Sequence, residues 1–100
     1  MPRYKFRLFV TGQGGHTPTA ITNLRAIGSQ FLNGDFELDI IDVLDQPAIA
    51  EEARVTMTPT LLKDTPLPAR RLVGDLSHTA RVLAALDISM ASDGNSRGRS

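Results

Sequence analysis

A glycine-rich segment, GQGGHTP at residues 12–18, is the first part of the sequence whose residue types could carry chemistry. A turn of this kind between a strand and a helix can hold a phosphate group on the backbone amides of the helix N-terminus. Gly12 and Gly14 begin the G-x-G-x-x-G pattern of dinucleotide-binding domains, but Thr17 occupies the third glycine position. A complete domain of that kind also needs two βαβ halves, for which 100 residues are too few. We therefore interpret the segment as a flexible turn.

Histidine and serine side chains form the second candidate set. The sequence has two histidines, His16 and His78, which are far apart and each stand at the start of a predicted helix. A catalytic zinc ion usually takes three protein ligands, often two of them at helical spacing, so this pattern favours solvated histidines. Ser77 and Ser89 lack an elbow motif, and the absence of cysteine excludes disulfides and thiol catalysis. We predict no enzyme, no cofactor and no metal site.

A proline-rich segment that ends in a basic pair, MTPTLLKDTPLPARRLVGDL, is the third candidate. Its opening resembles the segment beside the redox pair of thioredoxin-like domains, although this chain has no thiol. The prolines and the basic pair are Pro59, Pro66, Pro68, Arg70 and Arg71. Prolines restrict the backbone and remove hydrogen-bond donors, so the segment can hold more than one arrangement. On residue chemistry alone it is an ordinary loop between two strands.

The first half of the chain predicts a strand, a helix and a second strand. Apolar residues alternate with mostly polar ones over residues 4–11, which is the period of a strand. A helix should start at Thr17, whose hydroxyl can cap it, with Pro18 in the first turn, and should end at Asn33-Gly34. Residues 36–44 become apolar on both faces, which favours a strand inside a covered sheet. The two strands of such a βαβ unit should be parallel.

The second half predicts shorter elements. Residues 46–55 indicate a helix with a proline in its first turn, and residues 58–63 and 69–75 indicate two strands. A final helix, capped by Ser77, should cover residues 77–90. The resulting order is βαβαββα, which is an α/β fold of the thioredoxin-like kind. We expect one domain over residues 1–90 and a disordered tail over residues 91–100, where apolar residues are nearly absent.

Composition limits the possible partners and the compartment. The chain has 100 residues, of which 41% are hydrophobic, and this suits a single small domain. Eleven basic residues balance eleven acidic ones, so the chain lacks the positive charge that nucleic-acid binding requires. No apolar run is long enough to span a membrane, and the N-terminus lacks the features of a signal peptide. We expect a cytoplasmic protein that binds neither nucleic acid nor membrane.

Several motifs resemble the KaiB family of circadian clock proteins. They are DIIDVLDQPAIAEEARVTMTPTLLK and LPARRLVGDLS, the latter followed by RVLAALD, and the resemblance covers about residues 4–88. The first half is also similar to the N-terminal sensor domain of the clock-associated histidine kinase SasA. The resemblance implies a non-enzymatic protein that binds the hexameric ATPase and kinase KaiC and modulates its phosphorylation cycle. In full clocks such a complex captures KaiA and displaces SasA. The alternative is an adaptor or sensor domain that acts on a histidine kinase or another ATPase in stress signalling.

The resemblance further implies two folds for one sequence. One is a thioredoxin-like monomer that binds the ring, and the other is a βαββααβ fold that assembles as dimers and tetramers. In the second fold residues 80–88 must form a strand. Ala85 stands where the family often has glycine, and alanine is better than glycine in a helix by about 1 kcal/mol. We therefore expect this chain to lean toward the thioredoxin-like state.

Partner-binding or fold-switching roles carry over from the family to ten positions. They are Tyr4, Pro59, Pro66, Pro68, Arg70, Arg71, Gly74, Asp75, Ala85 and Asp87. We expect the end of the second helix, the TPLP loop and the Arg70-Arg71 pair to form the surface for KaiC, with the two arginines acting together as donors to acidic groups. The equal alternative is that the pair marks a solvated strand edge, which its charges protect from aggregation. The long GQGGH turn and the tail without an acidic run depart from cyanobacterial members and suggest a host with KaiC but no KaiA.

Overall fold

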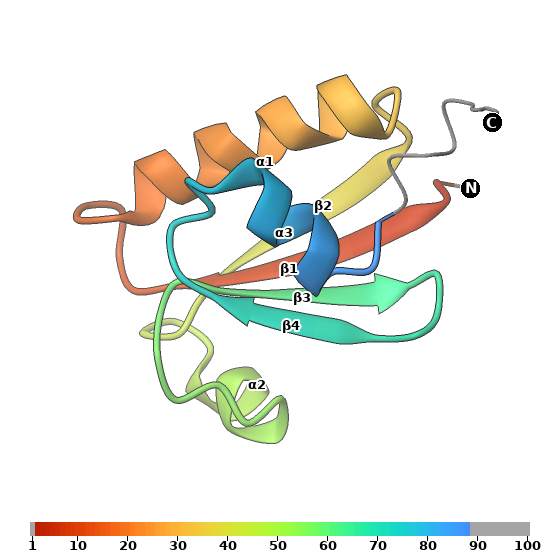
Figure 1. Ribbon diagram of the computed structural model, residues 1–100. Helices are drawn as coiled ribbons and strands as arrows, with labels where there is room; N and C mark the ends of the chain where they lie inside the picture. Colours follow the sequence, from red (N-terminus) through yellow and green to blue (C-terminus); the bar gives the residue numbers. More distant parts are fainter. Residues whose placement is uncertain (1, 89–100) are drawn as a thin grey trace, which may run out of the picture.

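A four-stranded sheet with the order β2-β1-β3-β4 lies at the centre of the protein (Figure 1). The structure is a computed structural model that describes residues 2–88. Its elements are β1 (Tyr4–Val10), α1 (Thr17–Phe31), β2 (Phe36–Asp42), α2 (Pro47–Glu52), β3 (Thr60–Thr65), β4 (Arg70–Val73) and α3 (Thr79–Ala85). β1 is parallel to β2 and antiparallel to β3, and β3 is antiparallel to β4. The predicted order and the predicted parallel pair are confirmed.

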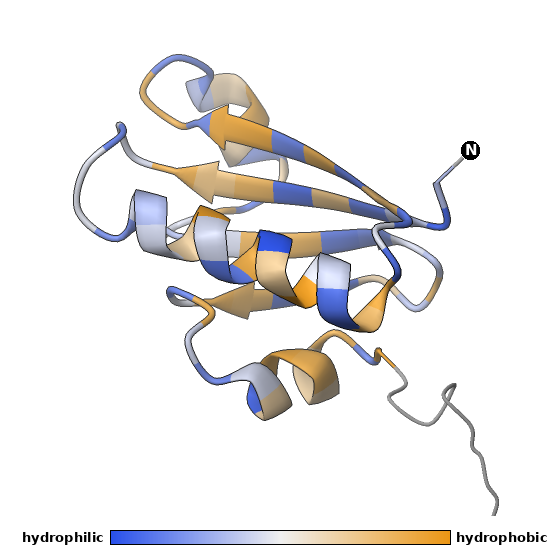
Figure 2. Ribbon diagram, turned by 90° about the horizontal axis from the view of Figure 1, so that it is seen from above, coloured by the Kyte–Doolittle hydropathy of each residue, from blue (hydrophilic) through white to orange (hydrophobic). Residues whose placement is uncertain are grey.

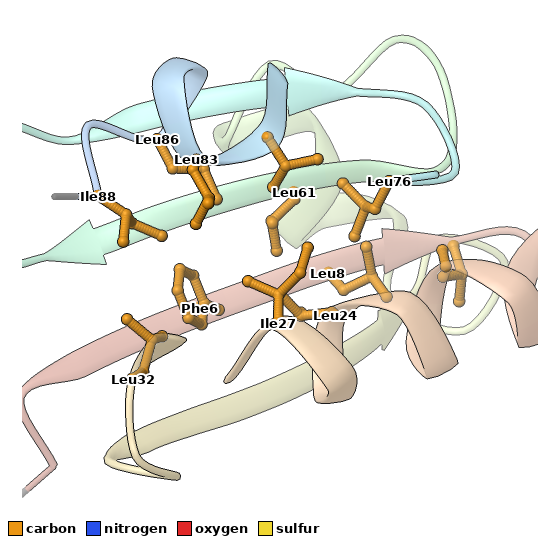
Figure 3. Close-up of a cluster of buried hydrophobic side chains, with 13 residues drawn as sticks. Phe6, Leu8, Leu24, Ile27, Leu32, Leu61, Leu76, Leu83, Leu86 and Ile88 are labelled. Carbon is orange, nitrogen blue, oxygen red and sulfur yellow. The ribbon is translucent and has the colours of Figure 1, made fainter. Parts of the chain in front are cut away.

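The main core lies between the sheet and the two helices α1 and α3, which cover the same face (Figures 1 and 3). Phe6 and Leu8 reach it from β1 because alternate strand residues share a face, while Leu24 and Ile27 reach it from α1 at helical spacing. Gly28 lets α1 approach the sheet closely, because a Cβ atom at this position would overlap the ring of Phe36. The strands accordingly carry alternating hydrophobic and hydrophilic bands (Figure 2).

A smaller core lies on the opposite face, beneath α2. It contains Phe9, Ile41, Ala50 and Leu62, each from a different element. Figure 1 shows that α2 covers only one end of this face and leaves the other end without a helix. Pro47 stands in the first turn of α2, as predicted, because this position needs no backbone donor.

The helix N-termini differ from the prediction. His16 and His78, rather than Thr17 and Ser77, are the N-cap residues, and neither makes a side-chain capping bond. The backbone N–H of Thr17 already bonds to the carbonyl of Gly14, so the chain has turned before Thr17, which is buried as the first helical residue. Ser77 lies one residue too early, since its backbone N–H bonds to Asp75 Oδ1 and α3 begins at Thr79.

The burial of β2 and the limits of β3 and α3 also differ from the prediction. The prediction that β2 is covered inside the sheet is wrong: it is an edge strand, with Ile40 42% exposed. β3 starts at Thr60 because Pro59 lacks the N–H that a ladder needs. α3 ends at Ala85, where the N–H of Ile88 bonds back to the carbonyl of Leu83. The predicted tail at residues 91–100 lies outside the described residues, as do the last two residues of the predicted helix.

Candidate partner-binding surface

A shallow groove of about 340 Å³ lies between the C-terminal end of α2 and the sheet. We call it the α2 groove. Its lining residues are Arg7, Ala53, Leu62, Lys63, Asp64, Ala69, Arg70 and Arg71. It therefore contains both arginines of the predicted surface and the end of α2.

Arg71 has a structural contact that the sequence did not indicate. Its guanidinium group donates hydrogen bonds to the backbone carbonyls of Ala53 (2.6 Å) and Arg54 (2.9 Å). These carbonyls follow α2, where helix geometry leaves acceptors without intrahelical partners. Arg71 thus ties the end of α2 to the sheet.

Arg70 and Arg71 do not act as one donor pair. Arg71 is in register with Leu62, which belongs to the core beneath α2, whereas Arg70 is in register with Lys63. Because side chains alternate along a strand, the two guanidinium groups leave β4 on opposite faces. The expectation of a shared bidentate pair is therefore corrected: of these two arginines, Arg70 is the one without a side-chain hydrogen bond to residues 2–88.

Arg7 and Asp64 form a bidentate ion pair at the side of the groove. Arg7 Nε and Nη2 lie 2.8 and 3.0 Å from the two carboxylate oxygens, and both side chains are about one-third exposed. The guanidinium carbon also lies 5.6 Å from the ring centre of Phe9. The two hydrogen bonds of this ion pair hold the Arg7 and Asp64 side chains in fixed positions on the sheet face that α2 leaves open.

Lys63 is the unexpected residue of β3, because its side chain is only 1% exposed. In register it faces Phe6, so its stem packs on the main-core side. Burial lowers the pKa of Lys63, the negative charge of Asp87 opposes this shift, and the positive charge of Arg70 adds to it. No hydrogen-bond or ion-pair partner of its ammonium group occurs within residues 2–88. The segment TLLKDT gave no signal for its inward position, because two adjacent leucines are followed by two adjacent charged residues and apolar and polar residues do not alternate.

The three prolines of the segment lie at opposite ends of β3. Pro59 is buried, and its carbonyl accepts a hydrogen bond from the N–H of Gly74 (2.9 Å), which joins the start of β3 to the end of β4. Gly74 has a φ of 130°, a conformation that only glycine adopts readily. Pro66 and Pro68 instead flank Leu67 at the tip of the β3–β4 hairpin, where Leu67 is 80% exposed. Each of the three prolines follows a cis peptide bond.

Asp75 brings the two distant histidines together. Its carboxylate lies 4.0 Å from His16 Nδ1 and accepts the N–H of Ser77, whose hydroxyl lies 3.3 Å from His78 Nδ1. The Asp75 carbonyl also accepts a bond from the Asn23 side chain (2.9 Å). Hydrogen bonding from Ser77 lowers the pKa of Asp75, and the two histidines lower it further. Within residues 2–88, no group of three or more histidine, cysteine or acidic side chains could hold a metal ion.

The remaining carried-over residues, Tyr4, Ala85 and Asp87, also lie apart from the groove lining. Tyr4 is half-buried at the start of β1 and stacks on Phe6, with ring centres 6.0 Å apart. Ala85 ends α3 and is half-buried, whereas Asp87 is exposed with a φ of 58°. The structure therefore gathers the arginines near α2, Asp75 near α1, and Asp87 near Lys63, and it does not join the ten positions into one site.

A family model described as the KaiB domain matches residues 7–88. The chain belongs to the KaiB family. Circadian clock protein KaiB3 of Synechocystis sp. strain PCC 6803 is 43% identical over 88 residues, which are 88% of this chain and 86% of that protein. Circadian clock oscillator protein KaiB of Prochlorococcus marinus strain SARG is 44% identical over 85 residues, or 85% and 73% of the two chains.

Solved structures confirm the thioredoxin-like fold of this KaiB-family chain. The N-terminal domain of Synechococcus elongatus SasA has a TM-score of 0.61 and 24% identity, and the match covers 83% of this chain and 81% of that one. Oxidized mitochondrial thioredoxin 3 from Saccharomyces cerevisiae has a TM-score of 0.67 and 20% identity, with 87% and 80% covered. At these identities the likeness concerns the fold alone. Among the described residues, no helix has the length and apolar character to cross a membrane.

Proposed function

We propose that this KaiB-family chain is a non-enzymatic regulator that binds a KaiC-type hexameric ATPase ring and modulates its phosphorylation cycle. The observation that carries the proposal is the family match over residues 7–88, together with relatives that are named circadian clock proteins. The α2 groove supports a role in binding, because it is shallow and its charged side chains Arg7, Asp64 and Arg71 are held in place by hydrogen bonds.

The proposed contact surface is the outer side of α2 with the residues that flank it. Leu44 precedes α2 and Met57 follows it, and these apolar side chains are 69% and 62% exposed. Glu51 and Glu52 are exposed on α2 itself. Apolar side chains within a polar rim are typical of protein interfaces. Arg70 belongs to the groove lining, although its guanidinium group leaves β4 on the opposite face, while Arg71 contributes by holding α2 in place.

Size-exclusion chromatography with KaiC from the same host and nucleotide tests the proposal. We expect the chain to co-elute with the ring, M57E and L44E to weaken the complex, and R70A to weaken it less. L67E tests whether the hairpin tip belongs to the surface, and R25A, on the exposed side of α1, is a control that should bind normally. Absence of co-elution with the parent chain would refute KaiC binding, and normal binding by M57E and L44E would place the surface elsewhere.

An adaptor role on a histidine kinase is the second candidate. The similarity to the SasA N-terminal domain favours it, because that domain belongs to a kinase and has the same fold. A pull-down with a SasA-like kinase of the host distinguishes the two roles. The same proposal includes a cytoplasmic location and a homodimer or homotetramer in the unbound state. In a host that has the full clock, it also includes binding to KaiA.

The proposal includes a second fold for the C-terminal half. Non-glycine residues with positive φ support it: Arg54, Leu76 and Asp87 lie in that half, and Asn33 lies in the other. Each such residue costs roughly 1–2 kcal/mol relative to a right-handed conformation. The sum is comparable with the few kcal/mol that separate two packings of a fold-switching protein.

A further inference from the structure

A second groove, with a volume of about 460 Å³, lies between the start of α1 and the end of β2. We call it the α1 groove. Figure 1 shows that β1 and β2 end on the side of the sheet where α1 begins. Ligands of open α/β sheets bind outside the carboxyl ends of parallel strands, which is where this groove lies. Its volume falls within the range of about 300–1,000 Å³ that is typical of small-molecule sites.

The floor of the α1 groove is apolar. Val10 of β1 is buried, and Ile21 of α1 is half-buried. Ile40 of β2 is in register with Leu8 of the main core, so it lies on the face that α1 covers, yet its side chain is 42% exposed. A hydrocarbon chain placed in the groove would remove this apolar surface from water, which favours binding.

Acidic side chains form the rim of the groove. Asp42 Oδ1 accepts hydrogen bonds from the backbone N–H groups of Gly12 (3.2 Å) and Leu44 (2.9 Å), which hold the carboxylate in place, and its second oxygen has no hydrogen bond to residues 2–88. Asp45 also lines the groove, and neither carboxylate has an ion pair in the described part of the chain. Residues 26–53 contain no lysine or arginine, and no basic side chain is among the described residues that line the groove. The negative charge of the rim is therefore not neutralised locally.

Thr17 is the buried polar residue of the α1 groove. It is only 7% exposed, and its hydroxyl has no hydrogen-bond partner within residues 2–88. A buried hydroxyl without a partner is costly, so this one indicates a ligand with a polar group. The start of α1 offers little to an anion, because Pro18 lacks an N–H and the N–H of Thr17 is bonded to the carbonyl of Gly14. With two carboxylates on its rim, the groove favours a cation that donates hydrogen bonds.

We propose that the α1 groove binds an aliphatic diamine or polyamine. A primary ammonium group has three N–H donors, for which the Asp42 carboxylate and the Thr17 hydroxyl supply acceptors. The methylene chain packs on Ile21 and Ile40, and a second ammonium group lies near Asp45. A lysine side chain of a protein partner has one ammonium group and matches only one of the two carboxylates. Because Asp45 is exposed, binding is weak and depends on salt.

An NMR titration of the ¹⁵N-labelled full chain with putrescine, a short aliphatic diamine, tests the proposal. At about 0.01 M salt, where the Debye length is about 30 Å, we expect saturable shifts of the amide peaks of Gly12, Ile21 and Ile40. At about 1 M salt, where this length is about 3 Å, binding should be lost. Butylamine, which has one ammonium group, should bind severalfold more weakly, and butanediol should cause no shifts. Absence of saturable shifts with putrescine overturns the proposal.

D45N and T17V test the two polar parts of the site. The Asp45 side chain makes no hydrogen bond within residues 2–88, so D45N should keep the fold and weaken putrescine binding severalfold. T17V keeps the size of the side chain and removes the hydroxyl, so it should also weaken binding. Its melting temperature without putrescine should equal or exceed that of the parent chain, because a buried hydroxyl without a partner is lost. Normal binding by both variants overturns the proposal.

D39N is the matched control, because it removes one negative charge from the opposite face of β2, where Asp39 is exposed and in register with Arg7. It should bind putrescine like the parent chain. Equal loss of binding in D45N and D39N overturns the proposal, since general attraction between charges would then be the cause. Tighter binding of Nα-acetyl-lysine amide than of putrescine also overturns it and assigns the groove to a lysine side chain of a protein partner.

Discussion

Single residues of this KaiB-family chain carry roles that their type alone does not reveal. Lysine is rarely buried without a partner, yet the Lys63 side chain is almost fully buried in β3. Residues other than glycine adopt a positive φ uncommonly, and Asp87 does so directly after α3. Each residue lies near the other, and the carboxylate of Asp87 acts on the pKa of Lys63. Both are therefore positions where the folded state is less stable than it could be.

Lys63→Met should stabilise the protein at neutral pH by about 0.5–2 kcal/mol, because methionine keeps the apolar stem and removes a buried charge. The folded-state pKa of Lys63 is lowered, so between that pKa and the ordinary lysine value the unfolded chain binds more protons than the folded one. Stability of the parent chain should rise with pH across that alkaline window, and the rise should vanish in the variant. Urea unfolding at several pH values measures both effects. Lys5→Met is the control, and an unchanged alkaline slope in K63M would contradict the assignment.

Asp87→Gly should raise the melting temperature of the thioredoxin-like state. Asp87 occupies the position after the α3 C-cap, since the N–H of Asp87 bonds to the Ala84 carbonyl and that of Ile88 bonds to the Leu83 carbonyl. Glycine favours this left-handed position, and the change also removes a negative charge from a helix C-terminus. We expect a gain of about 0.5–1 kcal/mol, reduced by the lost attraction to Lys63. Thermal unfolding measures it, with D87N as the comparison that removes the charge and keeps a side chain of the same size. A lower melting temperature in D87G would show that the attraction outweighs the strain.

Among the elements, α2 depends most on contacts outside itself. It has six residues, too few to be stable as an isolated helix, and it packs through Ala50 against Phe9, Ile41 and Leu62. Its presence was predictable, because PAIAEE follows a strand and has proline in the first turn. Its attachment to β4 through Arg71 was not predictable, because that contact depends on which face of a distant strand each arginine occupies.

Arg71→Ala should loosen α2 while leaving the rest of the sheet intact. The two hydrogen bonds to the carbonyls of Ala53 and Arg54 disappear, and hydrogen bonds from charged groups contribute about 1.5–3 kcal/mol each when buried, less at this exposed position. Hydrogen exchange of residues 50–55 should accelerate severalfold in R71A. R70A, which removes the neighbouring arginine from the opposite face, should leave these amides unchanged. Equal acceleration in both variants would mean that the contact does not hold α2.

At the scale of the whole molecule, the free energy of the described fold relative to the proposed second fold depends on features that favour it and features that oppose it. The described state has residues 79–85 in a helix packed on the main core. The opposing features are the left-handed residues in the C-terminal half and the buried charge of Lys63. If the chain has the proposed second fold, a small change in helix propensity should alter the populations of the two states.

Ala85→Gly should shift the balance away from the thioredoxin-like state, because glycine costs about 1 kcal/mol relative to alanine in a helix. This corresponds to a change of about fivefold in the population ratio of two states. Backbone NMR spectra of A85G should show a second set of peaks for residues 50–88, or a stronger one than in the parent chain. The A85G/D87G double variant should reverse the shift. A single set of peaks with uniformly lower stability would indicate that A85G only destabilises one fold.

The sequence by itself determined the element order, the parallel first pair of strands and the family, because local periodicity, turn residues and contiguous motifs carry that information. Only the tertiary structure decided that Arg70 and Arg71 have different roles, that Asp75 pairs with His16, and that the Lys63 side chain is buried. Each of these facts depends on the register and facing of segments that are far apart in the chain. A strand shifted by one residue exchanges its two faces, so the role of a side chain is fixed only when its strand is paired.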